Sequence, residues 1–223
     1  MKKETTRIVL IRHGQTAWNR TVRFRGQADP PMNEIGREQA EATARYVAKR
    51  WPVDGVYASP MGRAMETAEA IARTHRLSVQ PFEGLLDIDF GEWTGYSPEE
   101  VKARYPRLLQ AWFRAPHTVE VPGGESLAIV RERVTRGLRT VLSTHRGETV
   151  ALVGHMVVNR ILLCSVLGLS NEHFWRLRQD TCAINVFDID EEGNSTIVVL
   201  NDTCHLQDAR VTSGIQSKET ADA

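Results

Sequence analysis

The segment 8–14, with the sequence IVLIRHG, contains the pattern that decides the fold. Its first four residues are apolar and mostly β-branched, which predicts a short buried strand over Ile8–Ile11. Arg12 and His13 follow this strand directly. In α/β proteins ligands bind outside the carboxyl ends of the strands, so polar residues in this position are candidates for a functional site.

The same arrangement recurs further along the chain. Short apolar runs predict two more buried strands, over Val53–Ala58 and Thr149–Val153. Ser59-Pro60 follows the first of them and predicts a helix start, because Ser suits the N-cap and Pro the first helical position. Gly154-His155 follows the second. Apolar residues spaced by three or four predict further helices, over Glu34–Trp51, Glu125–His145 and Asn159–Leu167.

Strands that alternate with helices indicate an α/β domain with a largely parallel central sheet. A hairpin is predicted over Ala183–Ile189 and Thr196–Leu200, around a turn-like Glu-Gly-Asn. Between Asp89 and Glu125 four prolines predict a less regular segment, although Ser97-Pro98 should start a helix that ends before Pro106. We expect one domain over residues 1–208 and a flexible C-terminal tail over 209–223.

Composition narrows the classes of function. The chain of 223 residues has 28 Lys and Arg against 28 Asp and Glu, which argues against a nucleic-acid or anionic-membrane partner. The first apolar run is too short for a signal peptide or a membrane span. Three cysteines (Cys164, Cys182, Cys204) follow no metal-ligand spacing and make a disulfide framework unlikely, so we expect a cytoplasmic protein.

Four basic residues at strand ends and at one helix start suggest a chemistry. Arg12, His13, Arg63 and His155 should form a positive pocket at one edge of the sheet. Such a pocket suits phosphoryl transfer, because arginine binds phosphate oxygens bidentately and a neutral imidazole can attack phosphorus. Asp87 or Asp89, after Leu85-Leu86, would supply the acid that protonates the leaving oxygen.

Six segments, in this order, resemble the histidine phosphatase superfamily, in the branch with cofactor-dependent phosphoglycerate mutase and its phosphatase relatives. They are VLIRHGQTAWN at 9–19, SPMGRAMETA at 59–68, LLDIDFGEWTG at 85–95, GGES at 123–126, VGH at 153–155 and NDTCHL at 201–206. The resemblance implies a three-layer sandwich of the phosphoglycerate mutase type, with a mostly parallel sheet flanked by helices. It implies no metal and no cofactor.

The resemblance also implies roles for single residues. His13 matches the nucleophile, Arg12, Arg63 and His155 match the residues that bind the phosphate, and Asp87 matches a proton donor that is usually glutamate. The implied substrate-binding residues also include Asn19, Arg25, Gly26, Met156 and His205. Arg25 departs from the family, since relatives often have glutamine before this glycine.

Several alternatives stay open. Asp89 could be the acid in place of Asp87, and His205 could cap a turn rather than face the substrate. Glu125 could be a first-turn helix acid favoured by the helix dipole, or a substrate residue. Trp93 and Trp112 could line the pocket or fill the core.

The function we expect is hydrolysis of a small phosphorylated metabolite through a phosphohistidine intermediate. A phosphoglycerate mutase and a regulatory, protein-binding member are the alternatives, but the mutases carry an additional basic, proline-rich segment that residues 106–123 are too short to contain. Phe90 stands where phosphoserine-type relatives often have histidine, which argues against phosphoserine as the substrate. The oligomeric state stays open between a monomer and a homodimer.

Overall fold

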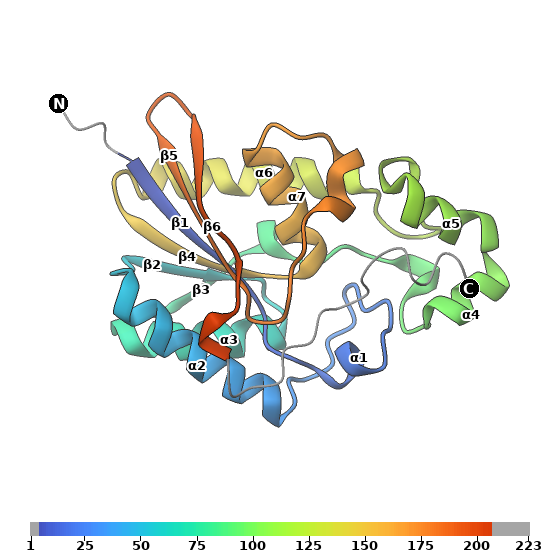
Figure 1. The fold of residues 1–223 in the computed structure, drawn as a ribbon, viewed down its shortest axis with the longest axis horizontal. Helices are drawn as coiled ribbons and strands as arrows, with labels where there is room; N and C mark the ends of the chain where they lie inside the picture. Colours follow the sequence, from blue (N-terminus) through green and yellow to red (C-terminus); the bar gives the residue numbers. More distant parts are fainter. Residues whose placement is uncertain (1–4, 207–223) are drawn as a thin grey trace.

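The computed structural model describes residues 5–206 and shows a six-stranded sheet between two layers of helices (Figure 1). The strand order is β3-β2-β4-β1-β5-β6. The strands span Thr5–Arg12 (β1), Gly55–Ala58 (β2), Val79–Pro81 (β3), Thr149–Gly154 (β4), Ile184–Asp190 (β5) and Ser195–Asp202 (β6). The first four are parallel to one another, whereas β5 and β6 form an antiparallel hairpin at one side. The predicted α/β sandwich with a mostly parallel sheet is therefore confirmed.

The helices form two layers and a small outlying group. They span Ala17–Arg20 (α1), Glu34–Arg50 (α2), Gly62–His75 (α3), Pro98–Arg104 (α4), Pro106–Arg114 (α5), Leu127–Thr144 (α6) and Met156–Val166 (α7). Short 3₁₀ turns cover Glu83–Leu85, Gly91–Trp93, Pro116–Thr118, Asn171–Arg176 and Cys204–Leu206. Helices α2 and α3 lie together beside the sheet, and α4 and α5 lie at one end of the molecule (Figure 1).

Alternation along β1 explains the two layers. Ile8 and Leu10 contribute to the core that includes α6 and α7, and Val9 and Ile11 contribute to the core that includes α2 and α3. A strand that is apolar on both faces must be covered on both faces, because each face removes apolar surface from water. This pattern makes β1 a central strand.

Parallel pairing brings the polar strand ends together. Arg12 at the end of β1 is in register with Gly154 at the end of β4, and Ala58 of β2 is in register with Val153. The residues that follow these three strands therefore emerge at the same edge of the sheet, as the sequence predicts.

Some predicted boundaries are wrong. The helix predicted to start at Ser59-Pro60 begins at Gly62, with Met61 as the N-cap. The helix predicted over Glu125–His145 begins at Leu127, because the hydroxyl of Ser126 accepts a hydrogen bond from Ile129 N and caps it. The helix predicted from Asn159 begins at Met156, directly after His155.

The proline-containing region is more regular than predicted. Ser97 caps α4 in a capping box with Glu100, and this helix ends before Pro106 as expected. Pro106 then starts a second helix, α5, which the sequence analysis missed together with the three-residue strand β3. A proline at the first position of a helix loses no internal hydrogen bond, so it can start a helix as readily as it ends one. The predicted tail 209–223 lies outside the described residues.

The first turn of α2 holds the loop that follows His13. Asn33 caps this helix by accepting from Gly36 N, and Asn33 N donates to the carbonyl of Gln15. A Cβ atom on Gly36 would lie 2.1 Å from the oxygen of Gln15. Glycine is thus required for this close approach.

Gly36→Ala should destabilise the protein. Alanine favours a helix interior by about 1 kcal/mol over glycine, but overpacking against a rigid backbone costs about 1–3 kcal/mol, so the net effect should be a loss. Thermal and urea unfolding measure it, with Glu38→Ala on the exposed face of the same helix as the control. A Gly36→Ala protein as stable as the control would contradict this packing.

Candidate active site

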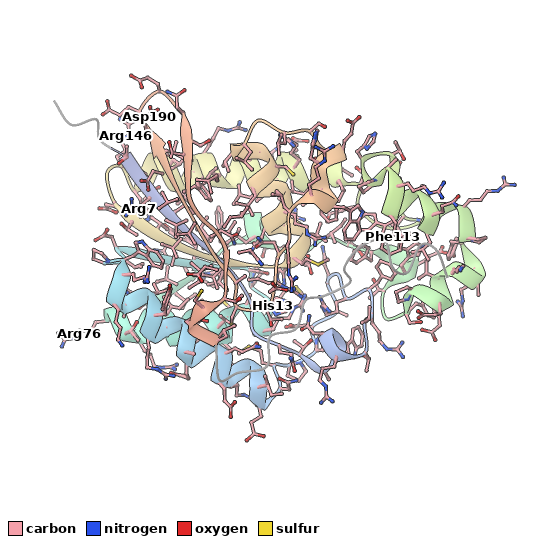
Figure 2. All side chains as sticks on the ribbon, viewed as in Figure 1. Arg7, His13, Arg76, Phe113, Arg146 and Asp190 are labelled. Atoms are coloured by element: carbon pink, nitrogen blue, oxygen red, sulfur yellow. The ribbon has the colours of Figure 1, made fainter. Side chains whose placement is uncertain are left out.

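Four basic side chains meet at the carboxyl edge of the sheet. Arg12 ends β1, His13 follows it, His155 is the N-cap of α7 after β4, and Arg63 is the second residue of α3. All four are fully buried. Figure 2 shows His13 at the lower end of β1, with Arg7 and Arg146 towards the opposite end of the sheet. The structure thus brings together the four residues that the sequence predicts as the centre of the site.

The ring of His13 is oriented by its own loop. Its Nδ1 lies 2.7 Å from the carbonyl oxygen of Gly14, so Nδ1 carries the proton and donates it. Gly14 N in turn donates to the hydroxyl of Thr67 at 3.1 Å. The other ring nitrogen, Nε2, is buried and has no hydrogen-bond partner among the described residues. A neutral His13 therefore presents the lone pair of Nε2 to the pocket.

Burial and neighbouring cations keep both histidines neutral. Burial is the first cause that lowers the pKa of His13 well below its usual range, and the positive charge of Arg63 is the second. The pKa of His155 is lowered in the same way, by burial and then by Arg63. The two rings lie 5.1 Å apart between centroids. Neutral imidazole is the form that can act as a nucleophile.

Backbone carbonyls hold the two arginines, and Arg63 Nη1 also donates to Oδ1 of Asp29 at 3.1 Å. Arg12 Nη1 donates to the carbonyl of Gln179 at 2.7 Å, and Arg63 donates to those of Ala28 at 2.8 Å and Gly26 at 3.0 Å. Among the described residues, Nε and Nη2 of Arg12 and Nε of Arg63 have no hydrogen-bond partner. Buried guanidinium donors without partners are costly, which indicates that this pocket is built for an anion.

Asp87 lies against this cluster and Asp89 does not. The Oδ2 atom of Asp87 is 3.4 Å from Arg63 Nη2 and 3.7 Å from His155 Nδ1. Burial raises the pKa of Asp87, although Arg63 and Arg25 oppose this shift. Asp89 instead accepts a hydrogen bond from Gly91 N at 2.8 Å. Of the two candidate acids, Asp87 is the one in contact with the basic cluster.

A small cavity opens beside Asp87. Its lining includes Arg25, Gly26 and Met156, three of the predicted substrate-binding residues. Its other walls are aromatic and apolar, apart from Arg23: Phe24, Phe90, Trp112, Val157 and Trp175. Both tryptophans pack in the core, and Trp112 also lines the cavity, whereas Trp93 is not in the lining.

Arg25 is the unusual member of this lining. It is 7% exposed, its Nη1 donates to the carbonyl of Trp18 at 3.4 Å, and its Nε has no partner among the described residues. Burial, and then the charges of Arg12 and Arg63, lower its pKa to about 9. This buried cation is available to a ligand in the cavity.

Two further predicted residues occupy different positions. Asn19 is buried, and its Oδ1 accepts from Thr16 N at 2.8 Å, while its Nδ2 has no partner among the described residues. His205 packs against α2 instead: its Nε2 lies 2.9 Å from Thr43 Oγ1 and its ring stacks on Tyr46. No contact of His205 with the four basic residues is seen among those described, so its substrate-binding role stays a prediction.

Sequence reasoning missed Arg160. This residue is 2% exposed, and its guanidinium lies 4.8 Å from the ring centroid of Trp175, a residue that lines the cavity. Its charge is also one cause that lowers the pKa of Arg12. The available signal was a charged residue within the apolar run Val157–Cys164, where burial without a function is unfavourable.

The described part of the chain offers few other sites. Within residues 5–206, no group of three or more His, Cys, Asp or Glu side chains is arranged to hold a metal ion. No helix in the same range is long and apolar enough to cross a membrane.

The family model for the histidine phosphatase superfamily, branch 1, matches residues 8–203. The chain belongs to this family. It is 37% identical over 200 residues to phosphoserine phosphatase 1 of Hydrogenobacter thermophilus, which covers 90% of this chain and 94% of that protein. It is 33% identical over 173 residues to a metal-independent phosphoserine phosphatase of Arabidopsis thaliana, with 77% and 73% covered.

A solved structure gives the same result. YhfR of Bacillus stearothermophilus superposes with a TM-score of 0.85 and 28% identity, covering 91% of this chain and all of the other. The resemblance seen in the six sequence segments is therefore confirmed, and this histidine phosphatase is an enzyme of the phosphatase type.

Activity should not depend on a divalent ion. The side chains of Arg12, Arg25 and Arg63 supply the positive charge that a metal would otherwise contribute. Phosphate release from a phosphomonoester should keep its rate after dialysis against EDTA. A loss of activity that one added divalent ion restores would contradict this prediction.

Proposed function

We propose that this histidine phosphatase hydrolyses a small phosphomonoester through a phosphohistidine on Nε2 of His13. The observation that carries the proposal is a buried, neutral imidazole whose Nε2 has no hydrogen-bond partner among the described residues, in a cluster where Arg12 Nε and Nη2 and Arg63 Nε also have none. Phosphate would bind between Arg12, Arg63 and His155, with the Nδ2 group of Asn19 as a further donor. The bidentate donors of arginine fit phosphate oxygens in number and geometry.

In the first step, the Nε2 lone pair attacks phosphorus and the bond from phosphorus to the ester oxygen breaks. That oxygen takes the proton of Asp87 and leaves as an alcohol, and Asp87 becomes a carboxylate. The phosphorylated imidazole gains a positive charge, which the hydrogen bond from Nδ1 to the Gly14 carbonyl stabilises.

In the second step, the carboxylate of Asp87 removes a proton from water. The water oxygen attacks phosphorus, the bond from phosphorus to Nε2 breaks, and inorganic phosphate leaves. His13 returns to the neutral form and Asp87 to the protonated form. Burial helps here because it raises the pKa of Asp87 and so favours the protonated acid.

A phosphoenzyme should form on His13. Rapid acid-free quenching with a ³²P-labelled substrate should trap one acid-labile phosphoryl group per chain. His13→Asn should abolish it and lower kcat by roughly 10⁴–10⁶-fold, the range seen when a nucleophile is removed. His117→Asn, which changes a histidine outside the cluster, is the control. An unlabelled wild-type enzyme that turns over at full rate would overturn the proposal, and transfer of the label to a second substrate molecule would favour a mutase.

The choice between Asp87 and Asp89 can be tested with two leaving groups. Asp87→Asn should lower kcat/KM about 10²–10⁴-fold on an alkyl phosphate, the usual contribution of a general acid. It should lower the rate far less on nitrophenyl phosphate, whose leaving group needs no proton. Asp89→Asn serves as the matched control. A selective loss on the alkyl phosphate in the Asp89 variant would reassign the acid.

The cavity beside Asp87 suggests which alcohols leave. Arg25 offers a cation to a second anionic group on the substrate, at the place where the leaving alcohol must lie. Among the described residues of the lining, Asp87 is the only carboxylate, and it must be protonated to act. A substrate ammonium group would therefore have no partner. We infer that a phosphorylated carboxylic acid is favoured over a phosphorylated amino acid, although relatives carry the name phosphoserine phosphatase.

Arg25→Gln should discriminate between substrates. A hydrogen bond between charged groups contributes about 1.5–3 kcal/mol, so kcat/KM for 3-phosphoglycerate should fall roughly 10–100-fold. Glycerol 3-phosphate, which lacks the carboxylate, should lose much less. Arg20→Gln is the control, because Arg20 is exposed and is not among the residues that line the cavity. Equal losses on both substrates would mean that Arg25 contacts the transferred phosphate instead.

A further inference from the structure

The segment that carries Asp87 is irregular. It runs between the 3₁₀ turns Glu83–Leu85 and Gly91–Trp93 and belongs to no strand or long helix. A carboxyl group that must reach the leaving oxygen needs a defined position, and misplacement by about 1 Å costs on the order of 10²-fold in rate. Something other than secondary structure must hold this segment.

Arg133 of α6 contacts the segment that carries Asp87. Its Nη1 donates to the carbonyl of Leu86 at 2.6 Å, and its Nη2 lies 3.5 Å from the carbonyl of Asp87. The residue before the acid and the acid itself are therefore held by one planar guanidinium. Its charge also contributes to lowering the pKa of His155.

Glu125 contacts both this segment and Arg133. Its Oε2 accepts from Asp89 N at 2.9 Å and also from Arg133 Nη2 at 3.0 Å. The backbone N of Glu125 donates to the carbonyl of Asp89 at 2.8 Å. Glu125 thus lies neither in the first turn of α6 nor against the basic cluster, the two roles that the sequence left open. It connects Arg133 to the acid segment.

Glycine permits this close approach. A Cβ atom on Gly124 would lie 2.6 Å from the carbonyl oxygen of Asp89, and one on Gly91 would lie 2.2 Å from that of Pro122. Gly91 also has a φ of +47°, a conformation that other residues rarely adopt. The backbone segments at 89–91 and 122–124 therefore lie in contact. Glu125 and Arg133, whose partly exposed side chains are 3.0 Å apart, lie beside this contact.

We propose that Arg133 and Glu125 are positioning residues that set the location of Asp87 for proton transfer. They touch no substrate, and they act through the backbone of Leu86, Asp87 and Asp89. This inference rests on the proposed role of Asp87 as the acid. The proposal gives the Gly-Gly-Glu-Ser segment at 123–126 a positioning role: Gly124 allows the close contact, Glu125 holds the acid segment and Ser126 caps the helix that bears Arg133.

Arg133→Met tests the proposal, with Arg133→Lys as the conservative variant. Arg131→Met is the matched control, because Arg131 lies on the same helix but donates to Leu169 and Asn171, outside the acid segment. We expect Arg133→Met to lower kcat/KM on an alkyl phosphate about 10–100-fold and on nitrophenyl phosphate less than about 3-fold. Arg133→Lys should recover part of the loss, and Arg131→Met should behave as wild type.

A double variant identifies the route of the effect. If Arg133 acts through Asp87, adding Arg133→Met to Asp87→Asn should cause little further loss on the alkyl phosphate. Full additivity, or equal losses on both leaving groups, would overturn the proposal. If Arg133→Met does not fold, Glu125→Ala carries the same comparison from the other partner. An Asp87→Asn variant without leaving-group dependence would instead show that the proposed acid itself is wrong.

Discussion

Buried positive charge is the constraint on which the rest of this structure depends. Arg12, Arg25 and Arg63 are all less than a tenth exposed, and they lie around two neutral histidines. Arg63 pairs with the buried Asp87 and with the exposed Asp29. Burying charge without full compensation is unfavourable. The carbonyl oxygens of Gln179, Ala28 and Gly26 offset part of this penalty, because they accept hydrogen bonds from the guanidinium groups. The donors left over are those that a phosphate dianion would satisfy.

The same positive charge acts differently on the pKa values of the nucleophile and of the acid. Cations stabilise the neutral form of His13, since its pKa is lowered by burial and by Arg63. They oppose the neutral form of Asp87, whose pKa is nevertheless raised because burial dominates. Burial thus favours the uncharged form of both groups, and the cations favour it for His13 but oppose it for Asp87. Proton transfer also needs correct placement of Asp87, and that is the task we assign to Arg133 and Glu125.

Much of the fold and of the candidate site could be predicted from the sequence, because both depend on the order of residues within short segments. A buried strand followed by Arg12-His13, and another followed by Gly154-His155, place three functional groups at one sheet edge as soon as parallel pairing is assumed. Arg133, Glu125 and Arg160 could not be assigned in the same way. Their roles arise from contacts between segments tens of residues apart, such as Arg133 with Leu86, which no periodicity encodes. Helix α5 was missed because Pro106 was interpreted only as a stop.

The central claim is that the pocket holds His13 as a neutral imidazole with its proton on Nδ1 and its Nε2 free. ¹⁵N NMR of histidine-labelled protein measures this directly, with the His13 resonances assigned from their absence in His13→Asn. The account predicts that at pH 7 the Nδ1 shift is that of a protonated nitrogen and the Nε2 shift that of an unprotonated one. Both shifts should persist well below the ordinary pKa of histidine, about 6.5. An imidazolium at pH 7, or a proton on Nε2, would contradict it.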